Sequence, residues 1–327
     1  MDETMSLVRK AVITAAGRGT RQYPATSVVQ KEMLPLVDRD GITKPVIQII
    51  AEEALEAGVN EICIVVSPGD EQQFRHHFRA IAHDLLPAFA GKEWALRESE
   101  KLAKIEGTLR YVVQQTPEGF GHAVYQCREF IGDEPFLLLL GDHIYIDLEG
   151  RRCARQLIDA YTVTKADSMS AVKRTPSSQL HLFGAIRGLL DADFDLPLYS
   201  VKAIEEKPSI DYAMKYLVTP GLPRGQFLCH FGMHVFSPAI FDCLEDLIKN
   251  GIRVRGEIQL TTAQQMLLDR LGKYYCCELT GDRYDTGVPF GLMEAQVALA
   301  LAGIYRVEIV ESLARLLAQQ LRTVSGR

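Results

Sequence analysis

The stretch Val12–Arg21 reads VITAAGRGTR, an apolar run that ends in two glycines on either side of Arg18, followed by a threonine and a second arginine. A short β-branched run that stops at a glycine turn is typical of a buried strand that leads into a loop. Glycine lets the backbone pass close to a bound molecule, and the amides of such a turn can point toward an anion. The stretch therefore predicts a strand and a ligand-binding turn. A plain strand-to-helix turn with surface arginines is the alternative.

Similar apolar runs follow and alternate with helical patterns: EICIVVS at 61–67, LRYVVQQ at 109–115 and FLLLLGD at 136–142. Continuous apolar strands separated by helices indicate βαβ units and a parallel sheet covered on both faces. Ligands collect at the carboxyl ends of the strands of such sheets. We therefore predict an α/β fold in which the glycine turn and the LLLLGD segment both lie at such strand ends.

The second half of the chain contains strand-like pieces joined by loop-rich segments, and it returns to helical patterns toward the end. No Pro-, Gly- or Ser-rich linker and no internal repeat divides the chain. We predict a single domain over 1–305 with a β-rich insertion, and a helical insert at 92–107. We expect residues 306–327 to form a helical tail that packs on a partner subunit.

The composition, 47% hydrophobic and 24% charged over 327 residues, is that of a globular protein. The net charge of -6 argues against a nucleic-acid or anionic-membrane surface. No apolar run reaches the roughly 18 residues of a membrane span, and the acidic start MDETMSLVRK is unlike a signal peptide. The seven scattered cysteines form no CxxC pair, which favours reduced thiols. We expect a cytoplasmic protein without nucleic-acid or membrane partners.

The glycine turn continues as GxGTRxxPxT over 17–26 and is followed by KEMLP at 31–35. Six further segments follow in order: QQTPEGFGHAV (114–124), LLLLGD (137–142), FGAI (183–186), VKAIEEKPS (201–209), GEIQL (256–260) and YDTG (284–287). Together these motifs resemble the sugar-1-phosphate nucleotidylyltransferases, specifically the bacterial UTP:glucose-1-phosphate uridylyltransferases (UDP-glucose pyrophosphorylases). The resemblance covers roughly residues 9 to 300.

The resemblance implies a Rossmann-like nucleotide-diphospho-sugar transferase (GT-A-like) fold, with a central mixed, mostly parallel sheet flanked by helices. It implies a nucleotide-binding part over about 9–165, a β-rich sugar-binding part over about 166–290, and a homo-oligomer, either dimer or tetramer. The implied reaction joins UTP and glucose 1-phosphate to give UDP-glucose and pyrophosphate. The alternatives are a dTTP- or CTP-dependent enzyme acting on another hexose 1-phosphate and a non-catalytic nucleotide-sugar-binding protein.

The nucleophile of that reaction is a phosphate oxygen whose second pKa is about 6, so it needs no general base at neutral pH. The barrier lies in bringing two polyanions together, which requires cations and positioning. By resemblance, Arg21 and Lys31 grip the triphosphate and Lys207 binds the sugar phosphate. Asp142 and Asp285 supply hard oxygen ligands for Mg²⁺. Helix-capping turn aspartates are the alternative.

The glycine turn offers Gly17 and Gly19 for close approach, and the Thr20 hydroxyl suits phosphate oxygens. The resemblance completes the nucleotide site with Ala15, Ala16, Gln114 and Gly119. It places Gly184 and Glu206 at the sugar. Gln114 could equally be strand-end filler, and Glu206 could form a structural ion pair with Lys207.

Two segments depart from the family pattern. VDRDGITKP carries five extra residues, 39–43, between Asp38 and Lys44. QFLCH at 226–230 lacks the Asn-x-Ala pattern associated with glucosyl recognition. These departures leave the sugar less determined than the reaction.

Overall fold

The computed structural model describes residues 8–325, without the side chains of 322–325. The first seven residues of the predicted domain and the last two of the predicted tail lie outside the described residues. The chain forms two compact units, each assembled from three segments. The first unit contains the segments up to residue 17, 51–141 and 154–279, and the second contains 18–50, 142–153 and the part from 280 onward.

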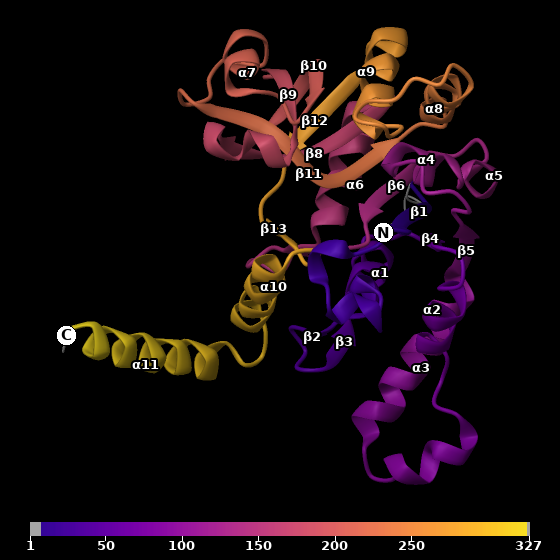
Figure 1. Ribbon diagram of the computed structural model, residues 1–327, viewed down its shortest axis with the longest axis vertical. Coiled ribbons are helices and arrows are strands. Elements are labelled where there is room, and N and C mark those ends of the chain that lie inside the picture. The colour runs from indigo at the N-terminus through magenta and orange to yellow at the C-terminus, as the bar shows by residue number, and fades with distance from the viewer. Residues whose placement is uncertain (1–7, 326–327) are drawn as a thin grey trace. The chain divides into compact units, whose positions relative to one another are not determined.

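The first unit is built on a nine-stranded sheet with the order β5-β4-β1-β6-β11-β8-β12-β10-β9 (Figure 1). Its strands are β1 (Lys10–Ala15), β4 (Glu61–Val66), β5 (Leu109–Val113), β6 (Phe136–Leu140), β8 (Ser168–Pro176), β9 (Gly184–Leu190), β10 (Leu198–Glu206), β11 (Gln226–Phe236) and β12 (Tyr274–Glu278). All three apolar runs that follow the opening stretch form strands of this sheet, which confirms the predicted α/β class.

The sheet is mixed, as predicted, but it is not mostly parallel. Strands β5, β4, β1 and β6 are parallel neighbours, whereas β11 runs antiparallel to β6, β8 and β9. Strand β10 also runs antiparallel to both of its neighbours, and only β12–β8 is parallel in this half. The reason is connection length: a parallel pair needs a crossover of a dozen or more residues, whereas β9 and β10 are joined by the short loop 191–197.

The parallel half aligns three chain segments at one edge of the sheet. Ala15 lies opposite Val66 in the register of β1 and β4, so the residues that follow these strands are neighbours. The Ser67 hydroxyl donates a hydrogen bond of 3.0 Å to the carbonyl of Ala16, and the amide of Gln114 donates one of 2.9 Å to the carbonyl of Val66. The carboxyl edge thus carries the first part of the glycine turn and Gln114.

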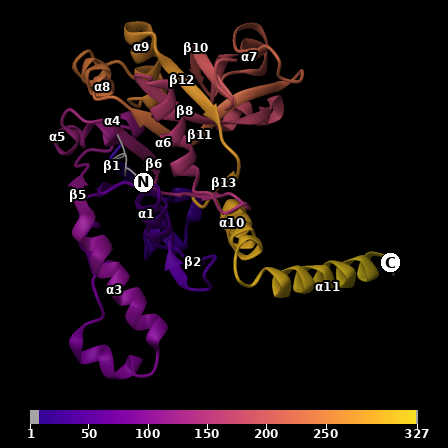
Figure 2. The same cartoon turned by 180° about the vertical axis from the view of Figure 1, so that it is seen from behind.

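Helices accompany this sheet in the first unit. They are α2 (Glu71–His77), α3 (Glu93–Thr108), α4 (Phe120–Tyr125), α5 (Arg128–Ile131), α6 (Cys153–Thr164), α7 (Ile210–Tyr216), α8 (Ala239–Lys249) and α9 (Leu260–Leu271), while α1 (Val46–Glu56) begins in the second unit and continues into the first. Helices α4, α8 and α9 pack on one another (Figure 1). The predicted helical insert is confirmed as α3, which extends with the 3-10 helix η4 (His83–Phe89) beyond β5 (Figure 2).

The second unit holds two small antiparallel sheets and two helices. Strands β2 (Pro35–Val37) and β3 (Thr43–Pro45) form a hairpin, β7 (His143–Ile146) pairs with β13 (Asp282–Asp285), and the helices are α10 (Pro289–Ala302) and α11 (Arg306–Ser325). Helix α10 packs against β2, β7 and β13. Helix α11 contacts α10 and extends beyond it, as both overall views show (Figures 1 and 2).

The five extra residues, 39–43, belong to the turn between β2 and β3 and the start of β3. The charges at this turn are paired with one another. The buried Lys44 ammonium lies 2.8 Å from Asp38 Oδ2 and 2.6 Å from Asp40 Oδ2. A buried lysine is tolerated only when its charge is paired in this way. The inserted turn is therefore anchored through Lys44.

No helix between residues 8 and 325 combines the length and apolarity needed to cross a membrane. All seven cysteines are free and buried, which confirms that they are not paired in disulfides.

The core of the first unit generates a stability prediction. Phe136 of β6 is fully buried and stacks on Phe241 of α8 with ring centroids 5.3 Å apart. Phe136→Ala should lower the free energy of unfolding by about 3–5 kcal/mol, since it loses apolar burial and leaves a cavity. Phe290→Ala is the matched control, because Phe290 is 66% exposed, and it should stay within about 0.5 kcal/mol. Urea denaturation compares the two, and equal effects would contradict this description of the core.

Candidate active site

Four of the predicted charged residues come together in the second unit. Lys31 Nζ lies 2.5 Å from Asp142 Oδ2, and Arg21 Nη1 lies 3.3 Å from Asp285 Oδ2. We call these four residues the charged cluster. The structure thus joins two predicted phosphate-binding cations to the two predicted metal ligands, although three segments distant in sequence supply them.

The glycine turn positions Arg21 through a 3-10 helix, η1 (Thr20–Gln22), and not through an α-helix. Gly19 has a φ of 62°, and a Cβ there would come within 2.9 Å of the Thr26 side chain, so glycine is required at this position. The Thr26 hydroxyl donates a 2.9 Å hydrogen bond to the Gly19 carbonyl. On the other side, Gln22 is buried and donates a 2.7 Å hydrogen bond to the carbonyl of Thr286. Arg21 is therefore held between two fixed neighbours.

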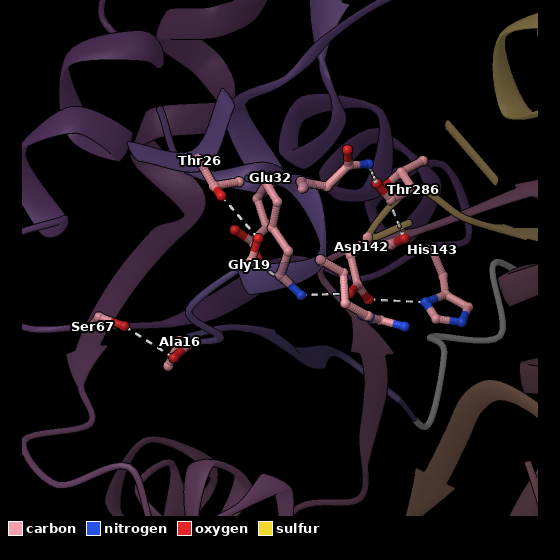
Figure 3. Close-up of polar contacts among 12 residues, drawn as sticks. Ala16, Gly19, Thr26, Glu32, Ser67, Asp142, His143 and Thr286 are labelled. Atoms are coloured by element: carbon pink, nitrogen blue, oxygen red, sulfur yellow. Dashed lines mark hydrogen bonds and ion pairs between the residues drawn. The ribbon is translucent and has the colours of Figure 1, made fainter. Parts of the chain in front are cut away.

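The two aspartates meet because β7 and β13 pair. Asp142 immediately precedes β7, and the antiparallel register places His143 opposite Asp285. The amide and the hydroxyl of Thr286 both donate to the Asp142 carbonyl, at 2.8 and 2.9 Å. Figure 3 shows Asp142 with the Thr286 contact on its main chain and His143 beside its carboxylate.

Gly287 leaves the space into which the two carboxylates point. A Cβ at this position would lie 2.7 Å from Asp142 Oδ2, 2.9 Å from Asp285 Oδ1 and 3.0 Å from Arg21 Nη2. The Gly287 amide also donates a 2.8 Å hydrogen bond to Asp285 Oδ1. Any larger residue would therefore push the charged cluster apart.

The donor atoms at this point fit a divalent cation. Asp142, His143 and Asp285 each offer one ligand atom, and these atoms lie within 4.8 Å of one another. Carboxylate oxygens are the donors that Mg²⁺ prefers, and Mg²⁺ takes only one or two of them from a protein. The two aspartates predicted as metal ligands therefore have a geometry compatible with that role.

The charges of the cluster reinforce one another. Burial acts to raise the pKa of Asp142, but the hydrogen bond from His143 and the positive charge of Lys31 outweigh it and hold the pKa far below its usual range. Burial acts to lower the pKa of Lys31, but attraction to Asp142 and Glu32 outweighs it, so this pKa is raised. Asp142 and Lys31 are thus both ionised at neutral pH.

Glu32, the neighbour of Lys31 in sequence, is buried in the second unit. Its side chain is 0% exposed. Its Oε1 lies 3.5 Å from Lys31 Nζ, and neither carboxylate oxygen makes a hydrogen bond within the part of the chain that the structure describes. Burial, opposed by Lys31, raises the pKa of Glu32 to about 8. Glu32 is therefore mostly protonated at neutral pH.

Gln114 and Gly119, both predicted to face the base, lie together in the first unit. The Gln114 side-chain nitrogen donates a 3.3 Å hydrogen bond to the Gly119 carbonyl and lies 3.0 Å from His122 Nδ1. Gly119 has a φ of 116°, and a Cβ there would meet Glu257 and Ile258 at 2.8 to 3.0 Å. Gln114 is therefore held by its own loop, and only glycine fits at the turn.

The predicted sugar residues are also neighbours in the first unit. Gly184 of β9 and Glu206 of β10 are cross-strand partners, and a Cβ on Gly184 would lie 3.0 Å from Glu206 Oε2. Burial raises the pKa of Glu206, with Lys207 opposing it. Lys207 Nζ lies 3.9 Å from Glu206 Oε1, so the alternative of an ion pair is present at long distance. Lys207 also has a φ of 46°, a strained value for a residue other than glycine.

The predicted site residues are divided between the two units. The second unit contains Gly19, Thr20, Arg21, Lys31, Asp142 and Asp285, and the first contains Ala15, Ala16, Gly17, Gln114, Gly119, Gly184, Glu206 and Lys207. Sequence reasoning missed His143, Gly287 and the burial of Glu32. His143 directly follows the motif LLLLGD, and Gly287 is the last residue of YDTG, so these motifs were the available signal.

Glu32 generates a pH prediction. Its folded-state pKa of about 8 lies above the value of about 4.3 for an unfolded glutamate. The folded protein binds this proton more tightly, so the resulting stabilisation is complete below about pH 4 and is lost as the pH rises through 8. Glu32→Gln cannot ionise, so its stability relative to the natural protein should increase between about pH 5 and 8 and level off above that. Urea denaturation across this range measures it, and a difference independent of pH would contradict the prediction.

Comparisons with known proteins show the family to which the chain belongs. The model of the family described as Nucleotidyl transferase matches residues 10–301. The chain is 36% identical over 307 residues to the UTP–glucose-1-phosphate uridylyltransferase of Bacillus subtilis, covering 91% of this chain and 92% of that protein. It is also 36% identical over 298 residues to UTP–glucose-1-phosphate uridylyltransferase 2 of Staphylococcus saprophyticus, covering 91% and 93%.

A solved structure extends the likeness to three dimensions. The crystal structure of a UDP-glucose pyrophosphorylase complexed with UDP-glucose superposes with a TM-score of 0.70 at 28% identity, covering 89% of this chain and 98% of that one. The family match spans both units and every predicted site residue. With its sheet, its motifs and its charged cluster, this chain belongs to the nucleotidyl transferase family.

Proposed function

We propose that the protein transfers the uridylyl group of UTP to glucose 1-phosphate, giving UDP-glucose and pyrophosphate. Relatives that carry this activity in their names align over nine-tenths of the chain. The observation that carries the proposal is the charged cluster, because Asp142, Asp285 and Arg21 meet beside Gly287. Lys31 joins them through its ion pair with Asp142. A nucleotide-binding protein without turnover has no need for paired carboxylates among its phosphate-binding cations.

The reaction requires stabilisation of negative charge and does not require proton transfer. The attacking oxygen of a sugar phosphate is already anionic at neutral pH, since its second pKa is about 6. What must be stabilised is the negative charge on the α-phosphate and on the departing pyrophosphate. Groups fixed in position before the substrate binds do this without reorganisation during the reaction.

Lys31 and Arg21 are the cations that meet this demand in the second unit. In the protein alone, their partners are the carboxylates of Asp142 and Asp285. We propose that Lys31 and Arg21 turn part of their hydrogen bonding to the triphosphate when it binds, with Arg21 forming the planar two-point contact that phosphate oxygens favour. The more exposed Arg21 side chain, at 57%, is the one that incoming phosphate reaches first.

Asp142 and Asp285 are the residues that would hold Mg²⁺. Magnesium bound there would act as a Lewis acid and offset charge on the phosphate oxygens. His143 orients the carboxylate by lying 2.9 Å from Asp142 Oδ1, and outer partners of this kind tune metal ligands. Gly287 keeps the space between the two aspartates open.

The first unit supplies the groups proposed for the base and the sugar. The amide of Gln114, fixed by Gly119 and His122, would recognise the uracil edge together with the main chain of 15–17. Glu206 would accept hydrogen bonds from sugar hydroxyls above Gly184. The strained backbone of Lys207 is the kind of feature that clusters at ligand sites, and its ammonium would bind the sugar phosphate.

The seven free, buried cysteines support the cytoplasm as the compartment in which this reaction takes place.

The substrates are tested by pyrophosphate release with Mg²⁺ across a grid of nucleoside triphosphates and hexose 1-phosphates. We expect UTP with glucose 1-phosphate to give the highest kcat/KM of the grid. Activity confined to dTTP or CTP would reject the uridylyl assignment. If no pair of substrates released pyrophosphate, the protein would be a nucleotide-sugar-binding protein and not an enzyme.

The proposed metal ligands are tested by Asp142→Ala and Asp285→Ala. Each should lower kcat by about 10²- to 10³-fold, the usual effect of removing one preorganised electrostatic group. Lys249→Ala, at an exposed position of α8, is the control and should leave kcat unchanged. Circular-dichroism melting shows whether each variant is folded. Near-normal turnover of either aspartate variant at saturating Mg²⁺ would remove its metal assignment.

A further inference from the structure

One departure from the family pattern, QFLCH at 226–230, has no role in the proposed reaction so far. Its last residue, His230, belongs to β11, and β11 pairs with β9 so that Cys229 lies opposite Ala185. Because this pairing is antiparallel, the next residue of β11 lies opposite the preceding residue of β9. The register therefore places His230 opposite Gly184, which is proposed to lie at the sugar.

Gly184 is flanked by side chains from both neighbouring strands. Glu206 of β10 is its partner on the other side of β9, and directly paired residues project to the same face of a sheet. A Cβ on Gly184 would lie 2.6 Å from His230 Cδ2, 3.0 Å from Glu206 Oε2 and 3.1 Å from the Thr261 methyl group. The imidazole ring of His230 therefore lies where a side chain of residue 184 would be.

His230 is packed against a second histidine, His234, that is itself fixed. The two rings meet edge to face, with their centroids 5.0 Å apart. The Nδ1 atom of His234 lies 2.7 Å from the Ser170 hydroxyl oxygen and 3.2 Å from the side-chain nitrogen of Gln264. Both histidines are buried, and closely packed interiors yield little to added volume. The His230 ring cannot withdraw from Gly184 without disturbing these contacts.

We infer that His230 is a specificity-determining residue whose ring limits the size of the sugar beside Gly184 and Glu206. An unsubstituted hexose is accepted, and a hexose that carries a bulkier group on this side is rejected. Glu206 is open to a sugar, since its side chain is 22% exposed. A bulkier sugar must displace the His230 ring or lose contact with Glu206, and overpacking of this kind is unfavourable. This inference rests on the proposed function, because it takes Gly184 and Glu206 to contact the sugar.

Calorimetric titration with UDP-sugars tests the inference. UDP-N-acetylglucosamine and UDP-glucose acetylated on its primary hydroxyl enlarge the sugar at different positions and leave the nucleotide unchanged. The natural protein should bind at least one of them about 100-fold more weakly than UDP-glucose, which is within the range of discrimination that pocket size achieves. His230→Val lacks the ring and suits a strand. It should lower that ratio of affinities at least about ten-fold.

Two further variants of His230 and a control complete the experiment. His230→Phe keeps a ring of similar size without its polar nitrogens, so it should keep the natural ratio if size is what matters. His230→Ala replaces the valine variant if that variant does not fold. Unchanged affinity for UDP shows that each variant is folded and that its nucleotide site is intact. His83→Val is the matched control, because His83 is an exposed histidine of η4, and it should leave every affinity unchanged.

Binding does not require turnover, so the proposed function and this inference fail separately. A protein that binds UDP-glucose but releases no pyrophosphate with any substrate pair would reject the proposed reaction, and the ratios would still decide the role of His230. Equal affinity of the natural protein for all three UDP-sugars would overturn the inference. So would an unchanged ratio in folded His230→Val, or an equal fall of the ratio in His230→Phe. Binding of UDP without any UDP-sugar would overturn both.

Discussion

The ion pair between Lys31 and Asp142 is the interaction on which the rest of the charged cluster depends. A carboxylate as buried as Asp142 would tend to become neutral, since burial disfavours the charged form. Lys31 at 2.5 Å and His143 at 2.9 Å keep it ionised. Its main-chain carbonyl also fixes Thr286, which follows the second aspartate. One residue thus links the loop after β6, strand β7 and the loop after β13.

This arrangement explains how a chain of net negative charge can serve an anionic substrate. The cations are not spread over the surface; Lys31 and Arg21 are gathered at one point and balanced by carboxylates while no phosphate is bound. Glu32 contributes by staying mostly protonated at neutral pH, because its burial raises its pKa to about 8. A third full negative charge beside Lys31 would weaken its attraction for phosphate. The proposed chemistry therefore follows from charges held in place before the reaction.

Much of the fold could be predicted from local sequence. The antiparallel strands and several residues of the candidate site could not, because they depend on contacts between distant segments. The stretch VITAAGRGTR predicted its strand and its turn because β-branched runs and glycines act locally. The parallel half of the sheet was also predictable from helix-length connections. The antiparallel direction of β11 was not, because it depends on pairing with β6 and β8, which are distant from β11 in sequence. Gly287 and His143 could not be assigned, since their roles arise only when β7 pairs with β13. The burial of Glu32 likewise depends on packing around it, not on its neighbours in sequence.

The central claim is direct displacement at the α-phosphorus, with the protein acting through charge and position. Nothing in the charged cluster is a hydroxyl or thiol nucleophile, although His143 lies beside it. The most direct test uses UTP with a sulfur atom at one configuration of the α-phosphorus, and phosphorus NMR of the UDP-glucose analogue formed. A single in-line displacement predicts inversion of configuration. Retention would contradict the account, because it requires two displacements and a covalent uridylyl-enzyme intermediate.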